Sequence, residues 1–202
     1  MATAAPAYQR TNILVGQASC FIQPYSSATP AALPPISQGL NVAWASPWVP
    51  VGATEKGLDF KYARKVVDVT VEEQMTPVAV PTKNLDWSLD LQLSEDTLQT
   101  MKTSFGGGTI TQVAASGTPG QAGYIPPYET FQISQDVQQL AFGFEQGNEY
   151  GLPRRCLVPV VVAAGTIDLK FQRADAQHMY MTSFRVLCDP TTVLWQNVKP
   201  GS

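Results

Sequence analysis

Two glutamates, Glu145 and Glu149, are the residues of this chain whose type and spacing come nearest to a catalytic pair. Two carboxyl groups can serve as general acid and nucleophile in the hydrolysis of a glycosidic bond. These two, however, flank a Gly-Asn dipeptide, and glycine with asparagine is typical of a solvated turn. We therefore interpret the pair as turn residues, with a glycosidase-like site as the alternative.

Other nucleophilic sites need a base, and His178 is the single histidine of the chain. The cysteines Cys20, Cys156 and Cys188 are far apart and show no CxxC spacing, so we predict buried free thiols and neither a disulfide nor a zinc site. No nucleophile is paired with a plausible base. The chain is therefore predicted not to be an enzyme, and a hydrolase that uses Asp168 or His178 is kept as an alternative.

Two motifs suggest anion binding. The glycines of SFGGGT, residues 104–109, follow a predicted helix, whereas a phosphate loop places its glycines before a helix N-terminus. Arg154 and Arg155 form a basic pair without interleaved aromatic residues, which indicates at most contact with a phosphate or an acidic partner. We predict no cofactor and no metal site.

The surface is predicted to be largely neutral, because charged residues make up 14% of the 202 residues, against about 25% in an average soluble domain. The net charge of −3 argues against a protein that binds in a groove of nucleic acid, but it does not argue against a surface that repels DNA. The longest apolar run, residues 157–167, is shorter than the ~20 residues of a spanning helix, and the N-terminus does not read as a signal peptide. We expect no membrane segment and synthesis in a reducing compartment.

The most regular pattern lies in residues 85–93, which alternate strictly between apolar and polar side chains. Alternation of period two is typical of a strand with one face in the core and the other in water. The predicted core face comprises Leu85, Trp87, Leu89, Leu91 and Leu93, and the predicted wet face comprises Asp86, Ser88, Asp90 and Gln92.

A short helix is predicted directly after this strand, over residues 95–105. Ser94 is a suitable N-cap, and the two acidic residues that follow it suit the positive end of the helix dipole. Gly106 can supply the left-handed residue that ends the helix. The side chains expected to face the core, at i, i+3 and i+7, are Leu98, Met101 and Phe105.

Further alternating segments predict a mainly β fold. The alternation changes phase near Val66 and Val67, which predicts a bulge in a long strand. The connection 72–84 is longer than an ordinary strand-to-strand link and is expected to be functional. The fold class is an antiparallel β-barrel or sandwich with one short α-helix and extended terminal arms. Other expected strands lie within residues 109–131, on both sides of a flexible loop, and within 131–144, 152–165, 166–173 and 178–188.

We place the β domain at residues 48–189, between an N-terminal extended arm, residues 1–47, and a C-terminal arm, residues 190–202. The first 54 residues contain a single charged side chain, Arg10, together with seven prolines and several aromatic residues. Disordered tails usually carry charge and lack aromatics, so the N-terminal arm is expected to lie on an apolar surface. The sequence leaves open whether that surface belongs to a neighbouring subunit or to the arm's own domain.

A strand with a wholly polar face opposite an apolar face suits a sheet that is wet on one side. When several copies of such a sheet join edge to edge, the wet faces can line a channel and the strand edges disappear into the ring. We therefore expect a lumen lined by Asp86, Ser88, Asp90 and Gln92.

Residues 48–108 carry a resemblance to a known family: WVPVGATEKGLDFKYARKVVDVTVEEQMTPVAVPTKNLDWSLDLQLSEDTLQTMKTSFGGG. A W-x-x-x-G-x-T-x-x-G opening is followed by a long bent strand, an acidic-Gln loop with a proline, a second alternating strand and a helix beginning near E-x-T-L. In order and spacing the segment resembles the tail tube (major tail) protein of long-tailed phages, particularly those that infect actinobacteria. The matching residues are Trp48, Gly52, Thr54, Gly57, Glu73, Gln74, Pro77, Leu85 to Leu93, Glu95, Thr97 and Leu98.

This resemblance implies hexameric rings that stack into a hollow tube, with an inner β-barrel wall lined by polar and often acidic side chains. It implies that the arms and the loop between the first two strands contact other subunits. The implied partners are further copies of the chain, the tape measure protein and translocating DNA in the lumen, and the tail terminator and tail tip proteins. The implied location is the virion, after synthesis in the cytoplasm of the host bacterium. The loop residues to which we assign the contacts are Glu73, Gln74, Met75, Pro77 and Pro81.

Two other functions fit parts of the sequence. Another β-rich virion protein, such as a tail terminator or a capsid decoration protein, would form a single ring or a trimer and would not stack. A carbohydrate-binding β-sandwich would stack sugar rings on Trp44, Trp48 or Trp195.

Overall fold

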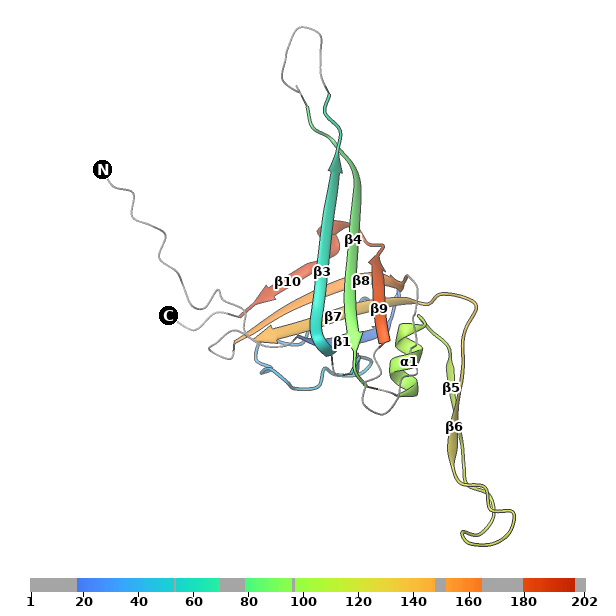
Figure 1. Cartoon of the computed structure of the whole chain (residues 1–202). Coiled ribbons are helices and arrows are strands. Elements are labelled where there is room, and N and C mark those ends of the chain that lie inside the picture. The colour runs from blue at the N-terminus through green and yellow to red at the C-terminus, as the bar shows by residue number, and fades with distance from the viewer. Residues whose placement is uncertain are drawn as a thin grey trace.

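The protein is built around one folded antiparallel sheet from which two hairpins project (Figure 1). The structure is a computed structural model, and it describes residues 18–52, 54–69, 79–95, 97–147, 152–164 and 180–198. Its elements are β1 (Ser19–Pro24), β2 (Val49–Pro50), β3 (Thr54–Val66), β4 (Thr82–Leu93), α1 (Leu98–Ser104), β5 (Thr109–Val113), β6 (Tyr128–Gln132), β7 (Gln139–Gly147), β8 (Pro153–Ala163), β9 (Tyr180–Val186), the 3-10 helix η2 (Pro190–Thr192) and β10 (Leu194–Asn197).

The main sheet has the strand order β2-β1-β7-β8-β9-β4-β3, and β10 pairs with the N-terminal half of β8. The sheet folds over so that distant strands meet: the ring of Phe60 in β3 lies 6.4 Å from that of Phe144 in β7 and 5.8 Å from that of Trp195 in β10. Within the described ranges, β2 and β3 do not pair to close a barrel. The predicted fold class is therefore confirmed as mainly β, antiparallel and sandwich-like, with a short helix.

The predicted alternation along β4 builds the core. Leu89, Leu91 and Leu93 are at most 2% exposed, and burial of one leucine side chain stabilises the fold by about 1.5–3 kcal/mol. They share the core cluster with Phe142 of β7 and Phe184 of β9. The two remaining residues of the predicted face, Leu85 and Trp87, are only half-buried, and they lie on the part of β4 that extends beyond its pairing with β9.

The β3–β4 hairpin extends beyond the rest of the sheet (Figure 1). A register shift between Lys65 and Val66 confirms the predicted bulge. The predicted connection 72–84 is shorter than expected, because β4 already begins at Thr82. Pro81, just before this strand, accepts a hydrogen bond on its carbonyl from the backbone N–H of Val67 at 3.0 Å. Pro81 is exposed. The other predicted contact residues lie outside the described residues: Glu73, Gln74, Met75 and Pro77.

Helix α1 begins later than predicted, because Thr97 and not Ser94 is its N-cap. The Thr97 hydroxyl accepts a hydrogen bond from the backbone N–H of Thr100 at 3.0 Å. At the other end Gly106 has a φ of 71°, and this left-handed residue closes the helix as predicted.

The helix buries a small polar face against the sheet, and of the predicted apolar stripe Met101 packs against the core cluster. Its buried residues are Thr100, Thr103 and Ser104. The Thr182 hydroxyl of β9 donates a hydrogen bond to the Ser104 hydroxyl at 2.7 Å. Small side chains let the helix backbone approach the strand closely, which a leucine or phenylalanine would prevent. The predicted stripe is only half-buried: Leu98, Met101 and Phe105.

Both predicted arms contribute strands to the sheet, so the boundaries at residues 47 and 190 do not separate arms from sheet. Strand β1, from the predicted N-terminal arm, lies between β2 and β7. The sequence does not predict this strand, because a six-residue strand that is buried on both faces shows no alternation of polarity. Strand β10, from the predicted C-terminal arm, pairs with β8. Residues 1–17 lie outside the described residues.

The segment between β1 and β2 covers the outer face of the sheet. Trp44 is 4% exposed and stacks on Phe21 of β1, with 4.4 Å between ring centroids. Gly143 of β7 leaves room for this indole, since a Cβ at that position would lie 2.3 Å from the Trp44 ring. Trp44 therefore packs on its own domain, while most of residues 25–48 remain exposed.

A buried ion pair fastens this segment to the sheet. The side chains of Glu145 in β7 and Arg155 in β8 are 1% and 0% exposed, and the Arg155 Nε donates to Glu145 Oε2 at 3.2 Å. The rest of the guanidinium donates to the carbonyls of Pro35 at 3.2 Å and Gln38 at 2.6 Å. The carboxylate also accepts from the backbone N–H of Asn41 at 3.0 Å. Because these partners satisfy both buried charges, the pair holds the covering segment in place.

We expect Arg155→Met to lower the free energy of unfolding by about 3–5 kcal/mol, because it leaves a buried carboxylate without its cation. Urea denaturation followed by tryptophan fluorescence measures the change. Arg154→Met, at the neighbouring half-buried position, is the matched control and should shift the free energy of unfolding by far less. Equal effects of the two substitutions would contradict the assigned role of the pair.

Candidate functional site on the polar face of β3, β4 and β9

The predicted lumen residues Asp86, Ser88, Asp90 and Gln92 lie on the face of β4 opposite its buried leucines, and each is half-buried. The strand register extends this face across the neighbouring strands. Ser88 lies opposite Lys61 of β3 and Arg185 of β9, and Asp90 lies opposite Asp59 and Ser183. The face also includes Ala63 and Lys65 of β3 and Met181 of β9.

Cross-strand ion pairs organise the charges on this face. The Lys61 Nζ lies 2.6 Å from Asp90 Oδ2 and 3.4 Å from Asp59 Oδ2. Farther along the hairpin, the Lys65 Nζ lies 3.3 Å from Asp86 Oδ2. Asp86 and Asp90 are thus paired with lysines on the facing strand, and Asp59 is paired with a lysine on its own strand.

Asp90 is the most constrained of these carboxylates. Its Oδ1 accepts a hydrogen bond from the Ser183 hydroxyl at 2.6 Å, while Oδ2 faces Lys61. Burial opposes its negative charge, but the hydrogen bonds from Lys61 and Ser183 and the attraction of the ammonium group outweigh burial and hold the pKa of Asp90 below its ordinary value. The hydrogen bond to Asp90 also raises the pKa of Lys61, with a further hydrogen bond to Asp59. The Lys61–Asp90 pair is therefore ionised across the neutral range.

The described part of the face carries no excess of acidic charge. Its three aspartates, at 59, 86 and 90, are balanced by two lysines and by Arg185, which is exposed and makes no ion pair within the described residues. Gln92 departs from its predicted solvated state, since its amide oxygen is buried without a hydrogen-bond partner in the described part of the chain. The face is thus polar and balanced in charge.

The alternative catalytic pair is not available to a substrate. Glu145 is buried in its ion pair with Arg155, and Glu149 lies outside the described residues. The two residues considered for a hydrolase, Asp168 and His178, also lie outside them.

The thiols and the glycine run have structural surroundings. Burial raises the pKa of the Cys20 thiol to about 12, and burial together with Cys188 raises the pKa of Cys156 to about 12. Cys188 is half-buried, and all three thiols are free, as predicted. The glycines of the SFGGGT motif follow α1 and pack against neighbouring side chains. Among the described residues, no group of three or more metal-ligating side chains is present.

The predicted sugar-binding tryptophans differ in exposure. Trp44 is buried, and the Trp48 indole N–H donates to the carbonyl of Ala32 at 3.1 Å. Trp195 is 52% exposed, but its ring packs edge-on against Phe60 and Phe144. No flat aromatic platform is therefore formed by these three residues.

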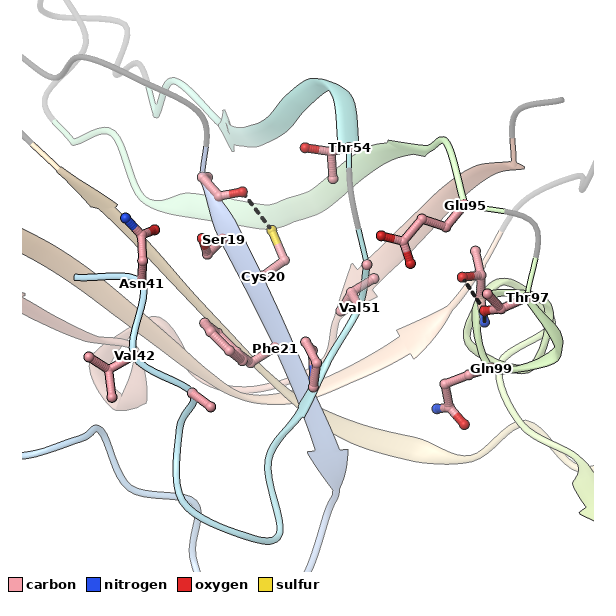
Figure 2. Close-up of a pocket in the computed structure, with 15 residues that line it drawn as sticks. Ser19, Cys20, Phe21, Asn41, Val42, Val51, Thr54, Glu95, Thr97 and Gln99 are labelled. Atoms are coloured by element: carbon pink, nitrogen blue, oxygen red, sulfur yellow. Dashed lines mark hydrogen bonds between the residues drawn. The ribbon is translucent and has the colours of Figure 1, made fainter. Parts of the chain in front are cut away.

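A groove that the sequence did not predict lies between β1, β2, the 41–43 segment and α1, with a volume of about 540 Å³. Figure 2 shows Val42 on one side of the groove and Glu95 and Gln99 on the other, with Phe21 and Val51 between them. No local sequence signal marks it, because its walls come from segments distant in the chain.

No protein-family model matches the sequence, and no curated protein sequence matches it either. None of the described helices is long and apolar enough to cross a membrane.

We expect Lys61→Met to raise the pKa of Asp90, because burial then acts on the carboxylate without the opposing ammonium group. Carboxyl-carbon NMR titration measures this pKa. The matched control is Lys83→Met, which removes an exposed lysine from the same hairpin. In the wild type, the stabilising effect of the Asp90 charge should be lost only as the pH falls through the lowered pKa. An unchanged Asp90 pKa in Lys61→Met would contradict the pairing.

Proposed function

We propose that this chain is a structural virion protein that assembles into rings, hexameric by resemblance, which stack into the hollow tail tube of a long-tailed phage. The observation that carries the proposal is the polar face of β3, β4 and β9, which lies directly opposite the buried leucines of β4. In the ring, this face lines the bore through which DNA passes.

The exposed strand edge and the hairpins support assembly. In the described structure β3 pairs only with β4, so its other edge is open to a neighbouring copy. The distal part of the β3–β4 hairpin exposes apolar side chains to solvent, which suits contact with another subunit. These side chains are Val66, Val67, Val69 and Val80, each 42% to 53% exposed.

The paired charges suit a bore that transmits DNA. Free lysines attract phosphates because binding releases condensed counterions. Here the Lys65 Nζ lies 3.3 Å from Asp86 Oδ2, and the Lys61 Nζ lies 2.6 Å from Asp90 Oδ2. Each of these lysines therefore has an ion-pair partner on the facing strand. Arg185 has no such partner among the described residues, so two of the three described cations of the face are paired. A lining of this kind holds the DNA backbone weakly and presents no strongly repulsive field.

The partners that follow from this role are other copies of the chain, the tape measure protein and DNA in the bore, and the tail terminator and tail tip proteins at the ends. The protein acts in the virion after synthesis in the bacterial cytoplasm. The role is one of assembly and needs neither enzyme chemistry nor a cofactor.

Negative-stain electron microscopy of the purified protein over a concentration series tests the proposal. We expect stacked rings or hollow tubes at high concentration, because apolar hairpin surfaces and open strand edges favour association by mass action. Single rings that never stack would instead favour a tail terminator or a decoration protein. Monomers at every concentration would contradict self-assembly.

We expect tubes of the double variant Asp86→Asn, Asp90→Asn to bind DNA that wild-type tubes do not retain, because the substitutions free Lys65 to contact phosphate and leave Lys61 with Asp59 as its one remaining described carboxylate. Filter binding at ~50 mM salt measures the gain, which should fall steeply towards ~200 mM salt. The matched control is Asp136→Asn, at an exposed position away from this face. DNA binding equal to that of the control would contradict the proposed lining.

A further inference from the structure

The β5–β6 hairpin stands apart from the main sheet and projects from the body (Figure 1). Its strands pair only with each other, and one bridge between Ser116 and Ile125 continues the pairing towards the tip. Its root is held by the contact between the rings of Phe105 and Phe131, whose centroids are 6.0 Å apart. An isolated two-stranded hairpin is at best marginally stable in water, so the outer part of this one is suited to bind another surface.

The surface of the outer hairpin is uncharged and partly apolar. Between Lys102 and Glu129 the sequence contains no charged residue. Ile125 is 51% exposed and Tyr128 is 49% exposed. A partner for this surface must therefore offer apolar area and neutral hydrogen-bonding groups, because a charged partner would lose its hydration without compensation.

The groove beside α1 has this complementary character. Its floor includes Phe21 and Val51, and Val42 on its wall is 49% exposed. Among its lining residues Glu95 alone carries a charge at neutral pH, and the other polar groups are hydroxyls and amides such as that of Gln99. Its volume of about 540 Å³ lies within the roughly 300–1,000 Å³ of ordinary binding clefts.

We propose that the outer part of the β5–β6 hairpin of one copy docks into the groove beside α1 of a second copy. The hairpin extends away from the body that carries its own groove (Figure 1), so the contact joins two chains. This docking rests on the proposed self-assembly, and the hairpin and the groove are two of the surfaces through which the copies associate. Because hairpin and groove are different surfaces, the contact is heterologous, and each copy that docks still presents a free hairpin or groove to the next.

Two aspartate substitutions test the two sides of the contact. Ile125→Asp places a charge on the hairpin, and Val42→Asp places a charge on the groove wall. Each should raise the concentration at which the full-length protein half-associates by about tenfold or more, as expected for a charge at the centre of an apolar contact. Sedimentation velocity measures association, and circular dichroism verifies folding. The matched control is Ile36→Asp, which changes an isoleucine that is 64% exposed and lies outside both surfaces.

Mixing the two variants gives the decisive result. Ile125→Asp retains an intact groove and Val42→Asp retains an intact hairpin, so an equimolar mixture should form heterodimers at concentrations at which each variant alone stays monomeric. Gln99→Arg, on the opposite wall, replaces Val42→Asp if that variant does not fold. Two results would overturn the docking alone. One is association of Ile125→Asp at the same concentration as the wild type. The other is a mixture of the two variants that stays monomeric while the wild type associates. A wild type that stays monomeric at every concentration would overturn both the docking and the proposed function.

Discussion

The buried ion pair of Glu145 and Arg155 is the contact that holds the covering segment on strands β7 and β8. Removing these charges from water costs several kcal/mol for each ion, and only a complete set of partners offsets that cost. Carbonyls of the 35–39 segment, the Asn41 N–H and the Trp44 indole supply the partners. The covering segment therefore adopts one position on the outer face of β1 and β7, and the polar face of β3, β4 and β9 remains uncovered by it.

The polar face of β3, β4 and β9 follows from the alternation of side chains along β4. Leucines at alternate positions of β4 face the phenylalanines of β7 and β9, so the intervening polar side chains are directed to the opposite side. The facing strand β3 supplies Lys61 and Lys65, which lie opposite Ser88 and Asn84 and reach the aspartates of β4 diagonally. Cross-strand register thereby converts a row of acidic residues into a balanced row of ion pairs.

Local signals in the sequence predicted the features that depend on local structure. The alternation along β4, the hairpin strands within residues 109–131 and the end of α1 at Gly106 each follow from neighbouring residues. Features that depend on contacts across the sheet were missed. β1 has no alternation because both of its faces are buried, and the Glu145–Arg155 pair emerges only once the β7–β8 register places the two residues opposite each other. The groove beside α1 was missed for the same reason.

The most direct test of the proposed tube is the radial position of the β4 side chains in an assembled particle. Cryo-electron microscopy of the purified protein at the concentration where it assembles gives this position. We predict that Asp86 and Asp90 face the bore, paired with Lys65 and Lys61, and that Trp44 lies in the layer outside the sheet. A reconstruction in which Asp86 and Asp90 lie on the outer surface, or are buried between subunits, would contradict it.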